Sequence, residues 1–233
     1  MAPPIPNASF HGQEFMMFSD PTVVLIELVL TLIAVAFCLV IYFKTREAYE
    51  LTKYESIKYF RNAFLFFGIS YILSFFSSIA IFSRIIFGVT LPREIFGSLF
   101  ILPLGYLSTM AILYLIYSSI WKNFDSKKTI IISHIVAIVL TIVTFITRSH
   151  LILLYLQSIL FILAIIFGLF ANKSKKKISQ TKILYFLVLG LWLVNLLILG
   201  NGRPLHPLID ISLLTLSIAA YIFIYYKILK WVK

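Results

Sequence analysis

Charge and cysteine are both scarce in this sequence. Only 12% of the 233 residues are Asp, Glu, Lys or Arg, whereas 61% are hydrophobic, and soluble domains average about 25% charged residues. The mean hydropathy of +1.01 points the same way. The single cysteine, Cys38, lies within an apolar run, so an intrachain disulfide cannot form. These scarcities exclude an ordinary soluble domain and predict a multi-pass protein of the cell membrane, with the lipid bilayer as a partner.

Acidic residues are scarcer than basic ones. The chain has 9 Asp and Glu against 20 Lys and Arg, and its formal net charge is +11. Such an excess is also typical of nucleic-acid-binding proteins, but here the basic residues fall in short segments between apolar runs, which is the membrane pattern. We therefore expect no nucleic-acid partner. Residues 1–20 contain no Lys or Arg and lack the basic start of a signal peptide, so we expect the first apolar run to be retained.

Motifs that carry chemistry are also missing. Residues 207–226 contain no lysine, which excludes the retinal Schiff base of a seven-helix photoreceptor. The four histidines are dispersed and do not supply paired axial ligands for a haem. His206 and Asp210 share a helix face with His150 as a third candidate, but zinc needs at least three ligands, and rim residues that bind water are the simpler interpretation. We predict no cofactor, no metal site and no enzymatic activity.

Long apolar runs dominate what is present. A helix needs about 20 apolar residues to cross a bilayer, and seven runs are long enough to do so. Pro103 predicts a kink within the third run. We predict an all-α polytopic membrane protein, in which a short extracytoplasmic tail, 1–21, precedes a single seven-helix transmembrane domain, 22–233. The predicted helices are 22–43, 60–87, 95–121, 128–147, 150–171, 181–200 and 207–231.

The distribution of Lys and Arg predicts the orientation. Sixteen of the 20 lie in alternate segments between the runs, and Lys and Arg in such segments mark the cytoplasmic side. The N-terminus is therefore predicted outside and the C-terminus in the cytoplasm. The largest segment, Lys44–Arg61, is predicted as a charged inner loop and as the contact for a cytoplasmic signalling partner. The basic segments are 44–61, 122–128, 173–182 and 227–233, and an aromatic belt of Tyr and Trp gathers at the same inner ends.

Small and polar residues recur at helical spacing within the runs. Helices in a bilayer turn such residues toward each other and leave aliphatic residues to the lipid. In the first run, Thr31, Ala34 and Cys38 share a face with Glu27. The other predicted inward faces are Ser70, Ser74, Ser77 and Arg84; Ser98, Gly105 and Thr109; His134, Thr141 and Arg148; His150, Gln157, Ala164, Gly168 and Ala171; and His206, Asp210, Ser217 and Tyr221.

Charged and amide residues within or beside the runs are the candidate pocket residues. Each is costly in hydrocarbon unless it faces a partner or water. Glu27 and Gln157 lie about 10 Å below the predicted outer ends of their helices, and an outward-facing polar pocket would collect the whole set. Glu27 is either a structural residue, neutral or paired with an Arg, or a proton, cation or ligand site. The candidates are Glu27, Arg84, Arg148, Gln157, Asn195, Arg203, His206 and Asp210.

Two functions fit this pattern. An odd number of helices, a pocket on one side and a charged inner segment favour a receptor-like sensor or signalling module that acts through a cytoplasmic partner. The alternative is a small solute or ion transporter, because the first three and last three helices run in the same directions around a connector, as in parallel 3+1+3 repeats. A transporter also needs polar residues along the inner half of its path, and the sequence places few there. Sensing is therefore the leading hypothesis.

Overall fold

Seven α-helices and no strand make up the residues described by the computed structural model, which are 21–88, 99–100, 102–121, 126–147, 150–170, 180–200 and 207–232. The all-helical prediction is confirmed for this part of the chain. The last four helices begin and end within two residues of the predicted runs. The helices are α1 (Pro21–Thr52), α2 (Glu55–Phe87), α4 (Leu102–Ile120), α5 (Ser126–Thr147), α6 (His150–Phe170), α7 (Gln180–Gly200) and α8 (Pro207–Val232).

The charged segment Lys44–Arg61 is helical, and the predicted inner loop is wrong. α1 continues nine residues beyond the predicted end of its run, and α2 begins five residues before the predicted start. Only Lys53 and Tyr54 separate the two helices. The end of the apolar run is not the end of the helix, because Lys, Glu, Arg and Ala are themselves strong helix formers.

Lys53 ends α1 in a left-handed conformation. Its φ is 53°, and its N–H donates to the Tyr49 carbonyl at 2.7 Å, which is the αL cap that usually employs glycine. The Ile57 N–H donates to the Tyr54 carbonyl at 2.9 Å and opens α2. The chain therefore reverses direction within two residues, and α1 and α2 form one continuous helical hairpin.

Pro103 lies in the first turn of α4. Pro103 is the second residue of this helix, where a missing N–H leaves no helical hydrogen bond unmade. The proline therefore lies at the start of α4; residues 99–100 before it are π-helical and residue 101 lies outside the described residues, so the kink within the run stays a prediction. Residues 95–98 and 101 of the predicted run lie outside the described residues.

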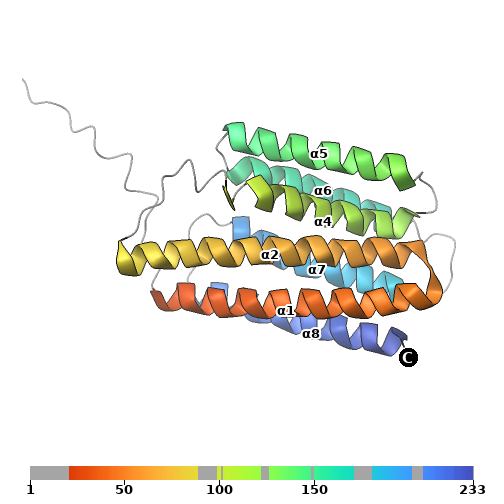
Figure 1. The fold of residues 1–233 in the computed structure, drawn as a ribbon, viewed down its shortest axis with the longest axis horizontal. Helices are drawn as coiled ribbons and strands as arrows, with labels where there is room; N and C mark the ends of the chain where they lie inside the picture. Colours follow the sequence, from red (N-terminus) through yellow and green to blue (C-terminus); the bar gives the residue numbers. More distant parts are fainter. Residues whose placement is uncertain are drawn as a thin grey trace, which may run out of the picture.

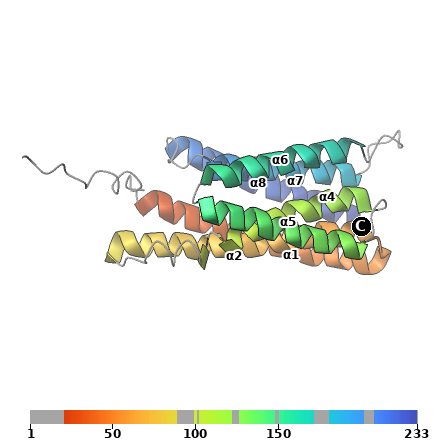
Figure 2. The same cartoon turned by 90° about the horizontal axis from the view of Figure 1, so that it is seen from above.

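The helices pack side by side, with consecutive helices antiparallel (Figure 1, Figure 2). α1 contacts α2 and α8, α7 contacts α6 and α8, and α4 contacts both α2 and α6. These pairs close a ring of six helices. α5 lies outside the ring, against α4 and α6 (Figure 1).

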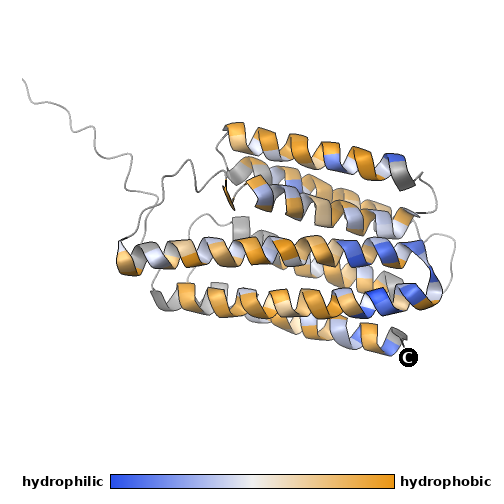
Figure 3. Ribbon diagram, in the orientation of Figure 1, coloured by the Kyte–Doolittle hydropathy of each residue, from blue (hydrophilic) through white to orange (hydrophobic). Residues whose placement is uncertain are grey.

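Hydrophilic residues gather at one end of the bundle. The turn between α1 and α2 and the last turn of α8 lie together there, and most of the remaining helical surface is hydrophobic (Figure 3). Among the described residues, the helical segments long and apolar enough to cross a membrane are Leu28–Thr52, Glu55–Ala80, Leu102–Ile120 and Lys128–Thr147. These four helices indicate a membrane protein.

Aromatic side chains fill the centre of the bundle. Phe66 of α2 stacks on Tyr114 of α4, with ring centroids 5.2 Å apart, and Phe161 of α6 stacks on Trp192 of α7 at 5.3 Å. Tyr221 of α8 is 1% exposed. Each helix of the ring contributes to this single core, whose largest fully buried members are Tyr221, Phe64, Ile41, Met110, Ile112, Leu115, Leu184, Ile224 and Ile228.

Candidate functional site

Most of the predicted inward faces are buried where the structure describes them. Thr31, Ala34 and Cys38 of α1 are buried, as are Gln157, Ala164 and Gly168 of α6. Helix α2 differs, since Ser70, Ser74 and Ser77 are only half-buried, and Ser78 is the buried serine. Large aromatic side chains occupy the buried face of α2, and the three serines lie beside that face. The further buried members of the predicted faces are Gly105, Thr109, Thr141, Ser217 and Tyr221.

Gln157 is the candidate pocket residue whose side chain the structure describes. It is 3% exposed, seven residues into α6, and its Nε2 donates to Ser108 Oγ of α4 at 2.7 Å. Ser108 in turn donates to the Gly105 carbonyl at 3.2 Å. An amide in hydrocarbon needs partners, and α4 supplies one. The predicted burial of Gln157 is therefore confirmed, and its contact is with α4.

The remaining candidates fall at the edges of the described residues. Glu27, Arg84, Asn195 and Asp210 belong to α1, α2, α7 and α8, but their side chains lie outside the described residues. Arg148, Arg203 and His206 lie outside them entirely. Glu27 is six residues from the start of α1 and Gln157 seven from the start of α6, and both helices begin at the same end of the bundle.

A second polar contact joins α4 to α5. The Tyr106 hydroxyl lies 2.6 Å from His134 Nδ1, and the two rings lie nearly parallel with centroids 6.1 Å apart. On the preceding residue of α5, Ser133 Oγ donates to the Tyr117 hydroxyl at 2.9 Å. Polar groups of α4 therefore contact both α5 and α6. Sequence reasoning singled out His134 but missed its tyrosine partners, since the partner of a tyrosine depends on which helices are neighbours.

The C-terminal end of α4 is fastened to the α1–α2 hairpin. Ser56 Oγ of α2 donates to the Ser118 carbonyl of α4, and both serines are buried. The Tyr54 ring packs edge-on against Trp121, with centroids 5.0 Å apart. Sequence reasoning missed these contacts because Ser56 lies in the segment predicted as a loop. In addition, a serine next to a glutamate at the start of a helix looks like an ordinary capping residue, so it does not indicate a contact with another helix.

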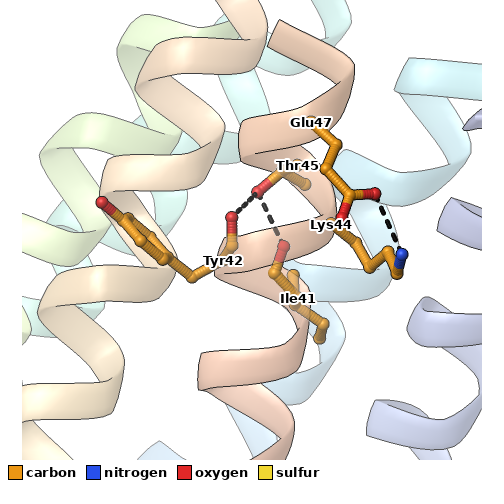
Figure 4. A network of polar contacts seen from close by, with 5 residues as sticks. All are labelled: Ile41, Tyr42, Lys44, Thr45 and Glu47. Carbon is orange, nitrogen blue, oxygen red and sulfur yellow. Dashed lines mark hydrogen bonds and ion pairs between the residues drawn. The ribbon is translucent and has the colours of Figure 1, made fainter. Parts of the chain in front are cut away.

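Polar contacts within α1 change in kind between neighbouring residues (Figure 4). Thr45 is fully buried, and its hydroxyl donates to the carbonyls of Ile41 at 2.7 Å and Tyr42 at 3.0 Å. The adjacent Lys44 points away from these carbonyls and pairs with Glu47 at 2.9 Å. The buried Thr45 hydroxyl therefore finds its acceptors within its own helix, whereas the Lys44–Glu47 ion pair is exposed.

Ion pairs cover the outer surface of the hairpin. Arg46 pairs with Glu50 at 2.8 Å, and Lys58 pairs with Glu55 at 3.1 Å. All the paired side chains are at least one-third exposed, so solvent screens each pair and it adds little to stability. Each pair joins residues of one helix, and all three lie at the predicted cytoplasmic end.

Comparison with known proteins found one relative. This chain is similar to an uncharacterized protein of Archaeoglobus fulgidus, with 29% identity over 200 residues that cover 83% of this chain and 86% of the relative. No protein-family model and no solved structure matches the sequence. The shared length includes most of the helices, so the similarity concerns the bundle as a whole.

Proposed function

We propose that the protein is a receptor-like membrane sensor with seven spans and its N-terminus outside. A small polar ligand binds at the outer ends of the helices, and the Lys44–Arg61 hairpin acts on a cytoplasmic partner. The observation that carries this proposal is the position of α4. Its outer part contacts the candidate pocket residue Gln157 through Ser108, and its inner end holds the hairpin through Ser118.

The two contacts give α4 the connections that a signalling helix needs. Ser108 and Ser118 are ten residues apart, which is about 15 Å along a helix axis. A rigid helix moves both ends together, so a ligand that shifts Gln157 also shifts the carbonyl that Ser56 binds. Allosteric coupling requires such an element with two arrangements, each favoured by one ligand state.

The packing of the inner half supports sensing over transport. Below the level of Gln157 the ring is filled by large apolar and aromatic side chains, and the buried hydroxyls there bind backbone carbonyls or a tyrosine. A path for a polar solute would need these side chains to part. Those that fill the inner half are Ile41, Tyr59, Phe60, Phe64, Leu115, Ile116, Leu184, Val188, Ile224 and Ile228.

A transporter is the second candidate, favoured by the order of the helices. α1, α2 and α4 contact one another in sequence, as do α6, α7 and α8, and α1·α8 is the counterpart of α4·α6. α5 joins the two triplets from outside (Figure 1). This is the 3+1+3 arrangement expected of a parallel repeat.

One experiment separates the two functions. Amino acids, monosaccharides and dicarboxylates are first screened for compounds that raise the unfolding temperature of the protein in nanodiscs. A fluorophore on Lys53→Cys then reports on the hairpin, since Cys38 is 1% exposed and does not react. The sensor proposal predicts that a stabilising compound changes this fluorescence, and that the same radiolabelled compound does not accumulate in proteoliposomes.

Variants assign the response to the proposed pocket. Gln157→Leu should fold but lose the fluorescence response, because the link to Ser108 is gone. Ser158→Ala is the matched control on α6, since its hydroxyl binds only the Leu154 carbonyl of its own helix at 2.8 Å. Glu27→Gln abolishes the response if Glu27 is a ligand site and preserves it if Glu27 is structural. Accumulation of the compound without a hairpin signal would establish transport instead.

A further inference from the structure

We propose that Arg61 binds the phosphate of an anionic phospholipid headgroup in the leaflet at the hairpin end of the bundle. Among the described residues of the hairpin, each glutamate is paired with another cation, as Lys44–Glu47, Arg46–Glu50 and Lys58–Glu55. Arg61 has no ion pair among the described residues, and its Nε is buried without a hydrogen-bond partner.

Two tyrosine rings of α1 hold the guanidinium in place. Its Cζ lies 5.6 Å from the centroid of Tyr42 and 5.4 Å from that of Tyr49. Tyr49 is itself fixed, because its hydroxyl donates to Glu55 Oε1 at 3.2 Å. Aromatic faces attract a guanidinium but leave its N–H donors free. Arg61 is therefore oriented in advance, and its Nε still lacks an acceptor.

The depth of Arg61 favours a lipid over a soluble protein as the source of that acceptor. It lies six residues into α2, about 9 Å from the turn along the helix axis. The tip of the hairpin projects beyond it. The level of Tyr42 and Arg61 is where the long apolar stretches of both helices end, and phosphates of the bilayer lie at that boundary.

The chemistry of the guanidinium selects phosphate. Its planar fork of N–H donors can bind two phosphate oxygens at once, which an ammonium cannot. The tip of the hairpin carries excess positive charge, which favours a lipid with net negative charge over a zwitterionic one. Lys53 contributes to this charge, and its Nζ lies 5.9 Å from the Tyr49 ring centroid. The inferred ligand is therefore an anionic phospholipid, and it does not depend on the sensor or transporter proposal.

The test measures lipid preference directly. Purified protein is exchanged into phosphatidylcholine nanodiscs with or without 30% phosphatidylglycerol, on the order of an anionic leaflet, and bound lipid is counted by native mass spectrometry. Wild-type protein should retain phosphatidylglycerol over phosphatidylcholine, and Arg61→Gln should lower that preference about fivefold, the value of one basic residue near the surface. Arg61→Lys keeps the charge without the fork and should lose part of the preference.

A matched cation provides the control. Arg46→Gln removes an arginine of the same hairpin that is already paired with Glu50 and lies toward the tip, so the lipid preference should stay at the wild-type value. An equal loss in Arg46→Gln and Arg61→Gln would overturn the proposal in favour of a diffuse positive surface. Stabilisation of wild type, but not of Arg61→Gln, by millimolar inorganic phosphate in pure phosphatidylcholine would overturn the lipid source and assign a soluble phosphate ligand.

Discussion

Neighbouring helices α4 and α5 have similar lengths and opposite surroundings. Twelve of the 19 residues of α4 are buried, including a continuous run from Thr109 to Ile116. α5 is the more hydrophobic of the two, yet it is buried along a single stripe of small residues. That stripe is Ser133, Ala137, Thr141 and Thr144 among the residues whose exposure is described, whereas the exposed side chains include Ile131, Ile132, Ile135, Ile138, Val139, Ile142, Val143, Phe145 and Ile146.

The difference shows that hydrophobicity does not predict burial in this protein. In water, a helix that exposes nine large apolar side chains would form an aggregating patch. In lipid the same surface is neutral, and small residues gain contact by letting helices approach closely. α5 therefore shows the membrane surroundings of the bundle, and α4 shows its packed interior.

The largest effect should come from a charge on the exposed face of α5. Ile138 is 46% exposed and lies near the middle of the helix, where a lysine costs roughly 2.5–3.5 kcal/mol on insertion scales. Ile138→Lys should greatly reduce membrane insertion, measured by glycosylation reporters. Ile131→Lys is the control near the end of the helix, where the side chain can reach the interface. Equal insertion of both variants would mean that this face meets water.

A larger side chain in the buried stripe of α5 should have the next largest effect. Ala137 is 0% exposed, so Ala137→Leu would force α5 away from α4 and lower the free energy of unfolding by about 1–3 kcal/mol. Denaturation in mixed micelles measures the change. Ile138→Leu, one residue along on the lipid side, should change it by under about 0.5 kcal/mol. Similar values for the two variants would remove the distinction between the faces.

Two glycines extend the comparison to α6 and α7. A Cβ at Gly168 would clash with the Tyr185 ring at Cε1, and the Tyr185 hydroxyl donates to the Ala164 carbonyl at 2.6 Å. Gly168→Ala should therefore destabilise the bundle by about 1–2 kcal/mol. A Cβ at Gly190 meets nothing within 4 Å, and Gly190→Ala should stabilise by up to about 1 kcal/mol through helix propensity. Unfolding temperatures of the pair test the α6–α7 contact, which is refuted if Gly168→Ala is the milder change.

The smallest effect concerns the hydrogen bond between α4 and α6. A double-mutant cycle with Gln157→Ala and Ser108→Ala should give a coupling free energy of about 0.6 kcal/mol, the average for such bonds in membrane proteins. The cycle cancels the cost of each truncation alone. Additive single-variant effects would show that Ser108 is not the partner of Gln157.

Sequence patterns predicted the parts of this fold that depend on local periodicity. The small residues of α1 and α6 mark the buried faces of these helices, because small side chains let helices approach closely and aliphatic ones can face lipid at no cost. The hairpin was missed because hydropathy falls at Lys44 while helix propensity does not. Ser78, Tyr106 and Arg61 were missed because their surroundings depend on which helix lies opposite, and a single sequence does not specify that neighbour.

The orientation of the bundle is the claim on which the sensor proposal depends most. Single cysteines at Ala2, Lys53 and Lys233 are labelled with a membrane-impermeant maleimide in intact and permeabilised cells. The unmodified protein serves as the blank, because Cys38 is 1% exposed. We predict that Ala2→Cys reacts in intact cells, whereas Lys53→Cys and Lys233→Cys react only after permeabilisation. Reaction of Ala2→Cys and Lys233→Cys from the same side would contradict the odd number of spans, and reaction of Lys53→Cys in intact cells would contradict the cytoplasmic placement of the hairpin.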